Sequence, residues 1–232
     1  MTHHSANKTI HLLALIVTAI AACACDWSAD YWTSSYIQEY VEIDGFYFRK
    51  NGAGEEFKFI SGHGKIGTFK DSGESKEWFD EICALNGDVT YNRKVHLIMG
   101  MPRIIAYTPD IVSIDVIAGD YYDTAHPAES SLNDCITIKY CSAAEYVEGD
   151  YKGNKPGISR KMLSDLTAKD LKILLHPECT LEFTVKPEEL TLHTMNIKMR
   201  LTDGQEYTSE FKFDFATYEL VPWRTPDRLS DD

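Results

Sequence analysis

The clearest pattern in the sequence is the strict alternation of apolar and polar residues in HTMNIKMRLTDGQEYTSEFKFDF, close to the C-terminus. A period of two is typical of a β-strand that buries one face. A two-residue Asp-Gly turn would set every apolar side chain of one arm opposite a polar side chain of the other. A three-residue loop at 202–204, with its glycine in the left-handed conformation, avoids that conflict. The predicted pairs are then Met199 with Tyr207 and Met195 with Phe211.

A second hairpin is predicted in FYFRKNGAGEEFKF, where each arm carries aromatic residues two positions apart. The aromatic rows are Phe46 and Phe48 on the first arm, and Phe57 and Phe59 on the second. The rows meet if Asn51 pairs with Gly54. The loop is then Gly52-Ala53, with glycine in the first position that a type II′ turn requires.

Further alternating or β-branched segments lie between the two hairpins, and helical periodicity is short and local. Strands are predicted at 95–99, 103–107, 111–117, 136–141 and 181–186. One helix is predicted in SKEWFDEICALNG, with Ser75 as N-cap and Asn86-Gly87 as its end. Another is predicted in TAKDLKILLHP, where Thr167 and Asp170 have capping-box spacing and Pro177 terminates the pattern.

Many short strands with helices only in connections predict an all-β protein, an antiparallel two-sheet sandwich of immunoglobulin-like or related type. The sandwich domain is expected to span 41–220, followed by a C-terminal tail at 221–232. No internal repeat or low-complexity linker interrupts the chain, which favours one domain over two.

The N-terminal apolar run at 12–22 is eleven residues long, whereas a spanning helix needs ~18 or more. Residues 20–23, Ile-Ala-Ala-Cys, resemble a bacterial lipobox, which implies that Cys23 is lipidated and that cleavage removes residues 1–22. Residues 23–40 would then form a lipidated tether and first segment. The alternative is an ordinary secretory signal that is cleaved before Cys25.

The chain is strongly acidic, with 36 Asp and Glu against 23 Lys and Arg and a net charge of −13. Removing the signal takes away one lysine, Lys8, and makes the balance more negative. Such a surface repels phosphate backbones, so a nucleic-acid partner is not expected.

After lipidation an odd number of cysteines remains: Cys25, Cys83, Cys135, Cys141 and Cys179. At least one thiol should therefore be free. Cys135 and Cys141 lie on one strand, ~20 Å apart at ~3.3 Å per residue, whereas a disulfide requires Cα atoms within ~7 Å. They should not pair. A lone H-x-x-C at His176 and Cys179 is not expected to bind a metal.

Two further patterns suggest chemistry. Gly62, Gly64 and Gly67 match G-x-G-x-x-G, but no helix opens at these glycines, so an inter-strand loop is expected.

The segment GDYYDTAHPAESSLND gathers acidic residues and a histidine, which could serve a cation or an acid–base pair. They are Asp120, Asp123, His126, Glu129 and Asp134. The spacing is not that of a calcium loop, so neither metal nor cofactor is expected. His193 is expected to be a satisfied core residue.

Aromatic residues cluster directly after the predicted anchor, at Trp27, Tyr31, Trp32 and Tyr36. Aromatic rings stack on the apolar faces of sugars, which makes this cluster a candidate ligand-binding surface. The alternative is that these residues form the first strand or cap the sandwich core.

The lipobox, DYYDTAHPAESSLNDCITIKY, LSDLTAKDLKILL and the final hairpin TMNIKMRLTDGQEYTSEFKF together resemble a group of small lipoproteins of Bacteroides-type bacteria. The resemblance covers most of the mature chain and its motifs are structural. It implies a Gram-negative envelope location, at the outer membrane, on the periplasmic face or the cell surface. It carries over no catalytic residues.

The function expected from these patterns is that of a membrane-anchored envelope lipoprotein that binds a glycan or a protein without catalysis. One alternative is a polysaccharide hydrolase that uses Asp120 and Asp123, since such enzymes place two carboxyl groups across a cleft. Another is a scaffold or inhibitor subunit of an envelope complex.

Overall fold

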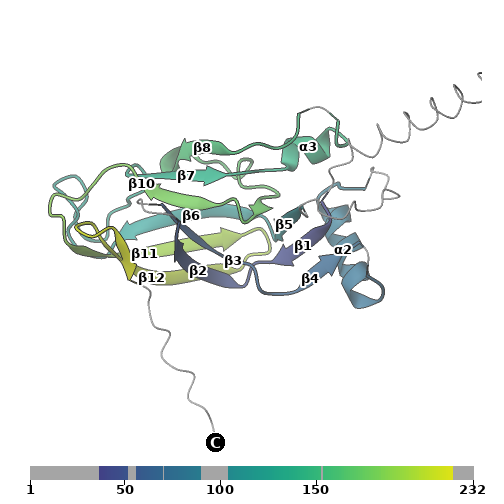
Figure 1. Cartoon of the computed structure of the whole chain (residues 1–232), viewed down its shortest axis with the longest axis horizontal. Helices are drawn as coiled ribbons and strands as arrows, with labels where there is room; N and C mark the ends of the chain where they lie inside the picture. The colour runs from purple at the N-terminus through teal and green to yellow at the C-terminus, as the bar shows by residue number, and fades with distance from the viewer. Residues whose placement is uncertain (1–36, 52–55, 70, 90–103, 153, 222–232) are drawn as a thin grey trace, which may run out of the picture. The chain divides into compact units, whose positions relative to one another are not determined.

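The strands and helices of this chain were located in a computed structural model that describes residues 37–51, 56–69, 71–89, 104–152 and 154–221 (Figure 1). The strands are β1 (Glu39–Glu42), β2 (Gly45–Lys50), β3 (Glu56–Ser61), β4 (Ile66–Thr68), β5 (Ile105–Thr108), β6 (Ile111–Ala118), β7 (Ile136–Tyr140), β8 (Ser159–Met162), β9 (Leu175–His176), β10 (Thr180–Phe183), β11 (Leu192–Leu201), β12 (Glu206–Asp214) and β13 (Glu219–Val221). The helices are α2 (Glu74–Leu85), α3 (Ala144–Glu148) and the 3₁₀ turn η1 (Leu163–Asp165). The predicted strand at 95–99 lies outside the described residues.

Two sheets form the body of the fold, one ordered β2-β3-β10-β7-β8 and the other β13-β12-β11-β6. All strand pairs within these two sheets are antiparallel. Their inner faces share one hydrophobic core, in which Phe57 of β3 lies 5.1 Å from Phe211 of β12, centroid to centroid. Each fully buried side chain of this kind contributes roughly 1.5–3 kcal/mol. The predicted all-β, sandwich-like fold is confirmed.

A third sheet, ordered β4-β1-β5-β9, was not predicted. It contains a parallel pair, β1 with β5. Together with α2 it encloses a second core that includes Ile37, Tyr40 and Phe79. The buried carboxylate of Asp88 accepts hydrogen bonds from the hydroxyls of Tyr40 (3.0 Å) and Tyr151 (2.6 Å). Since Ile37 and Tyr40 are buried, the folded body includes the last residues of the predicted 23–40 segment.

The register predicted for the C-terminal hairpin is confirmed. In the β11–β12 pair, Met199 lies opposite Tyr207 and Met195 lies opposite Phe211. Gly204 has a φ of 88°, the left-handed conformation that the three-residue loop requires. The apolar residues of both arms therefore face the same core.

The register predicted for the first hairpin is wrong. Lys50 pairs with Phe57, and the amide of Asn51 donates to the carbonyl of Glu56 at 2.9 Å, so Asn51 does not pair with Gly54. The loop at 52–55 lies outside the described residues. A slip of two residues leaves every side chain on its original face, so the aromatic pattern could not distinguish the two registers. A register shift between Phe46 and Arg49 was also not apparent from the sequence.

Helix α2 ends as predicted, with Gly87 at a φ of 69° after Asn86. Its start differs, because Gly73 occupies the N-cap position and the Ser75 hydroxyl instead donates to the carbonyl of Ile66. Leu85, the last residue of the helix, is exposed.

The helix predicted in 167–177 is wrong. The segment consists of turns that lead into β9, which pairs with β5. The Asp170 carboxylate does accept from the amide (3.0 Å) and hydroxyl (2.7 Å) of Thr167, as capping-box spacing predicts. However, the same carboxylate also binds Lys161 and Tyr140, and these tertiary bonds hold the segment in a turn. Helix α3 was not predicted.

The described cysteines Cys83, Cys135, Cys141 and Cys179 are buried, and no disulfide joins any two of them. The expectation that Cys135 and Cys141 do not pair is confirmed. Among the described residues, no helix is both long and apolar enough to cross a membrane.

The G-x-G-x-x-G segment connects β3 to β4 and opens no helix, as expected. Its last glycine lies in β4 directly beneath α2. A Cβ on Gly67 would lie 2.5 Å from Cε3 of Trp78 and 3.1 Å from Cα of Phe79. The glycine therefore allows close packing of the helix on the strand.

We expect Gly67→Ala to destabilise the protein by ~1–3 kcal/mol, because overpacking forces the helix away from the strand. Urea unfolding followed by tryptophan fluorescence measures this change. Gly157→Ala is the matched control, since a Cβ there meets no atom within 4 Å. Equal stabilities of the two variants would contradict the assignment.

Candidate functional site

The predicted lipid attachment site Cys23 and the aromatic residues Trp27, Tyr31, Trp32 and Tyr36 lie outside the described residues. Their roles stay predictions. The acidic segment between β6 and β7 is described in full, so the candidate residues Asp120, Asp123 and Asp134 can be located.

Asp120 joins the start of this loop to β11. Its carboxylate is hydrogen-bonded to Nδ1 of His193 (2.7 Å) and to the amide of Thr194 (2.8 Å). His193 is buried, and its Nε2 lies 2.8 Å from the carbonyl of Glu189, as expected for a satisfied core histidine. Asp120 therefore stabilises the fold.

Asp123 shapes the next turn. Its Oδ1 accepts from the amides of Ala125 and His126, each at 2.8 Å, and is also 2.8 Å from Nδ1 of the His126 ring. Burial acts to raise the pKa of this carboxyl, but the hydrogen bonds from His126 and the backbone lower it below its ordinary value. Asp123 thus fixes both the backbone and the ring of His126.

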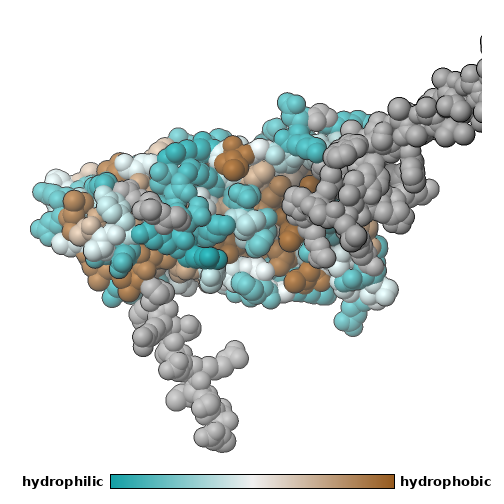
Figure 2. Space-filling view, viewed as in Figure 1, coloured by the Kyte–Doolittle hydropathy of each residue, from teal (hydrophilic) through white to brown (hydrophobic). Residues whose placement is uncertain are grey.

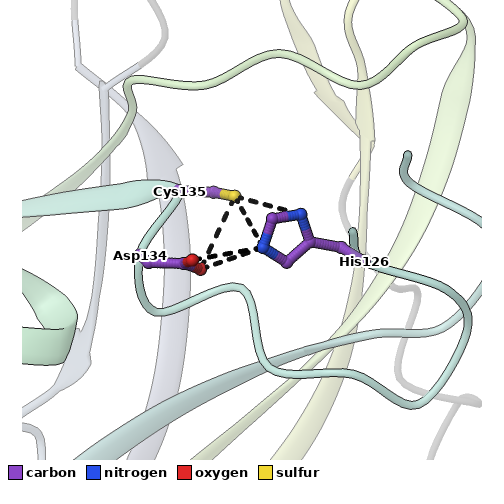
Figure 3. A group of neighbouring side chains, drawn as sticks. All are labelled: His126, Asp134 and Cys135. Atoms are coloured by element: carbon purple, nitrogen blue, oxygen red, sulfur yellow. Dashed lines mark hydrogen bonds and ion pairs between the residues drawn. The ribbon is translucent and has the colours of Figure 1, made fainter. Parts of the chain in front are cut away.

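His126, Asp134 and Cys135 converge at the end of the loop (Figure 3). The ring Nε2 of His126 lies 3.1 Å from Oδ1 of Asp134 and 3.6 Å from Sγ of Cys135. Sγ of Cys135 lies 3.8 Å from Oδ1 of Asp134. The three donor atoms form a small triangle, from residues separated by up to nine positions in sequence.

Burial and the neighbouring carboxylates together set the electrostatics of this cluster. Burial, and then the charges of Asp134 and Asp123, raise the pKa of the Cys135 thiol to about 12. Burial acts to lower the pKa of His126, but hydrogen bonds to Asp123 and Asp134 raise it above its ordinary value.

The arrangement of cysteine, histidine and aspartate has the connectivity of a nucleophile, a base and an orienting carboxylate. A nucleophilic cysteine, however, needs a lowered pKa in electropositive surroundings. Cys135 has a raised pKa and is 1% exposed. This geometry suits a set of metal ligands better than a reactive thiol.

A separate groove lies beside α3 and the start of β8. Its volume is about 490 Å³, within the range of ligand-binding clefts. Its lining is rich in hydroxyl, amide and charged groups, and includes Ser142, Asn154, Lys155, Lys169 and Asp170.

Asp170 is the most heavily bonded residue of the groove. Besides Thr167, it accepts from the ammonium group of Lys161 (2.6 Å) and the hydroxyl of Tyr140 (2.9 Å). Burial acts to raise the pKa of Asp170, but these hydrogen bonds hold it well below its ordinary value. The carboxylate therefore joins β7, β8 and the turn at 167–170 into one wall.

The sequence did not indicate this groove, because its residues come from three separate segments, 140–146, 154–161 and 167–170. The sequence did single out His126 and Asp134 in the acidic loop, but it treated Cys135 only as a strand cysteine. Comparison with protein-family models, curated proteins and solved structures finds no match to this chain. The function must therefore be inferred from the residues themselves.

We expect Asp170→Asn to cost ~1–3 kcal/mol at pH 7, because a hydrogen-bonded charge is lost from a partly buried site. A lowered folded-state pKa stabilises the protein above the unfolded-state value of ~3.9, and that stability is lost as the pH falls further. The gap between wild type and variant should therefore narrow between pH 5 and pH 3.

Urea unfolding at several pH values measures this gap. Asp165→Asn, which changes an exposed carboxylate nearby, is the control and should leave stability within ~0.5 kcal/mol. A gap that widens as the pH falls would contradict the role of Asp170.

Proposed function

We propose that this chain is a lipid-anchored protein of the bacterial outer membrane, whose β-sandwich binds an acidic glycan in the groove beside α3 without catalysing a reaction. The observation that supports this proposal best is the lining of the groove. Sugars need many hydrogen-bond donors and acceptors, and the groove supplies hydroxyls, an amide, lysines and carboxylates.

The charge of the groove supports an acidic ligand. Its lining contains three lysines, Lys155, Lys161 and Lys169, against two carboxylates, Glu145 and Asp170. Lys161 pairs with Asp170 and Lys169 with Glu145, which leaves the charge of Lys155 in excess on a chain with a net charge of −13. An excess positive charge in a cleft attracts ligands of the opposite sign.

The visible surface also favours a polar ligand. On the face shown in Figure 2, hydrophilic residues cover much of the described surface, and hydrophobic residues form separate small areas. Broad exposed apolar patches are typical of protein interfaces. A polar ligand therefore suits this face better than a large apolar partner.

The hydrogen bonds of Asp120 and Asp123 support a non-catalytic protein over a hydrolase. A glycosidase needs one carboxyl group free to donate a proton and another free to attack or activate water. Here both carboxylates are hydrogen-bonded within the fold, to His193 and to His126.

Lipidation at Cys23 is the part of the proposal that fixes the location. We expect the wild-type protein to partition with outer membranes and to begin, in intact-mass spectra, at an acylated Cys23. Cys23→Ser should abolish both properties, because several acyl chains are needed for durable anchoring. Cys25→Ser is the matched control and should remain membrane-bound. An unmodified chain beginning at Cys25 would overturn the anchor.

Glycan binding is measured by calorimetry of the detergent-solubilised protein with neutral and acidic polysaccharides. We expect heat with an acidic glycan, and at least ~10-fold weaker binding by Lys155→Ala/Lys169→Ala, because charge-assisted hydrogen bonds are lost. Lys76→Ala/Lys212→Ala removes two lysines away from the groove and should bind as the wild type does.

Silence with every glycan would overturn the proposal. If a specific envelope protein then co-purified from solubilised membranes, the chain would instead be a scaffold or inhibitor subunit.

A further inference from the structure

We propose that His126, Asp134 and Cys135 bind a single Zn²⁺ ion, with Asp123 holding the histidine ring in place. The site lies in the loop between β6 and β7 and shares no lining residue with the groove beside α3. It is therefore independent of the proposed glycan binding.

The spacing of the three donor atoms fits a tetrahedral ion. Zinc binds sulfur at ~2.3 Å and nitrogen or oxygen at ~2.0 Å, so tetrahedral ligands are separated by about 3.5 Å for S–N, 3.3 Å for N–O and 3.5 Å for S–O. The corresponding distances here are 3.6, 3.1 and 3.8 Å. Each agrees with the expected edge to within about 0.3 Å.

The histidine is supported as a metal ligand should be. Zinc-binding histidines almost always donate their second ring N–H to a carboxylate or carbonyl. In His126, Nδ1 lies 2.8 Å from Oδ1 of Asp123, while Nε2 lies 3.1 Å from Oδ1 of Asp134 and 3.6 Å from Sγ of Cys135 (Figure 3). The His126 ring also packs edge-on against Tyr122, with centroids 6.2 Å apart.

The other side of the site is held by the sheet. Cys135 directly precedes β7, and its carbonyl accepts from the amides of Thr184 (2.9 Å) and Val185 (3.2 Å) beyond β10. The thiol is thus presented from a fixed backbone. Sγ lies nearly equidistant from Nε2 (3.6 Å) and Nδ1 (3.8 Å), so coordination through Nε2 requires a rotation of the ring toward Asp134.

Charge and ligand type favour zinc. Cysteine and histidine suit Zn²⁺, whereas calcium and magnesium prefer all-oxygen sites. On binding, the Cys135 thiol releases its proton to solvent and the resulting thiolate forms the Zn–S bond. Nε2 of His126 likewise releases its proton to solvent, and the freed lone pair forms the Zn–N bond. The thiolate and Asp134 then neutralise the ion, and Asp123 remains paired with the His126 ring. The Asp134 side chain is 64% exposed, so the fourth position faces solvent.

The test uses the detergent-solubilised full chain, stripped with a chelator and titrated with Co²⁺ and then Zn²⁺. We expect one equivalent of Co²⁺ with a thiolate-to-cobalt charge-transfer band, bleached by Zn²⁺. Cys135→Ser should lose the band, whereas Cys141→Ser, which removes a buried thiol at the opposite end of β7, should keep it. Asp123→Asn should weaken Zn²⁺ binding by ~10–100-fold.

Asp134→Ala keeps the test decisive if the cysteine variant fails to fold, because the substituted side chain is largely exposed. It should retain the wild-type circular dichroism spectrum while binding Zn²⁺ at least ~10-fold more weakly, since one of three protein ligands is gone. Wild type that binds no stoichiometric Co²⁺ or Zn²⁺ would overturn the proposal. So would a charge-transfer band that persists in Cys135→Ser, or Zn²⁺ affinity that is unchanged in Asp134→Ala.

Discussion

The structure depends on an aromatic seam that joins its two large sheets. The seam consists of Phe57, Phe183, Phe211, Phe213 and Phe215, all nearly fully buried. Their ring centroids lie about 5 Å apart across the sheet interface, at 5.1 Å for Phe57–Phe211 and 5.1 Å for Phe183–Phe213. Aromatic pairs at such separations contribute beyond their buried area. Because the seam fixes both sheets, the loops at their edges can carry polar groups without weakening the core.

The same seam explains which parts of the fold were predictable. In the C-terminal hairpin, the wrong loop length would have turned apolar residues away from the seam, so the alternation selected the observed register. In the first hairpin, a slip of two residues keeps Phe57 and Phe59 facing the core, so the pattern was ambiguous. The turn at 167–170 was misread as a helix because Thr167 and Asp170 make the same local hydrogen bonds at a helix N-terminus and in this turn. The turn is selected by Lys161 and Tyr140, which lie nine and 30 positions from Asp170 in the sequence.

The sites were less predictable than the fold for a related reason. The acidic loop was visible in the sequence, including His126 and Asp134, but its acidity resembled an ordinary solvated surface. What distinguishes it is the turn made by Asp123, which aims the ring of His126 at Cys135. The sequence does contain a short pattern for this cluster: Asp123 and His126 form D-x-x-H, and Asp134-Cys135 begins eight residues after the histidine. The groove beside α3 had no such signal, because tertiary structure alone brings its segments together.

The two sites differ in charge, and this difference argues that they bind different ligands. Around Cys135, the carboxylates of Asp123 and Asp134 lie on either side of the His126 ring and close to a buried thiol. Beside α3, lysines gather on a chain that is otherwise acidic. The first site offers sulfur, nitrogen and carboxylate ligands to a cation, whereas the second offers lysine side chains to an anion. The two sites have no residue in common. Each ligand can therefore bind in the absence of the other, and the failure of one proposal does not affect the other.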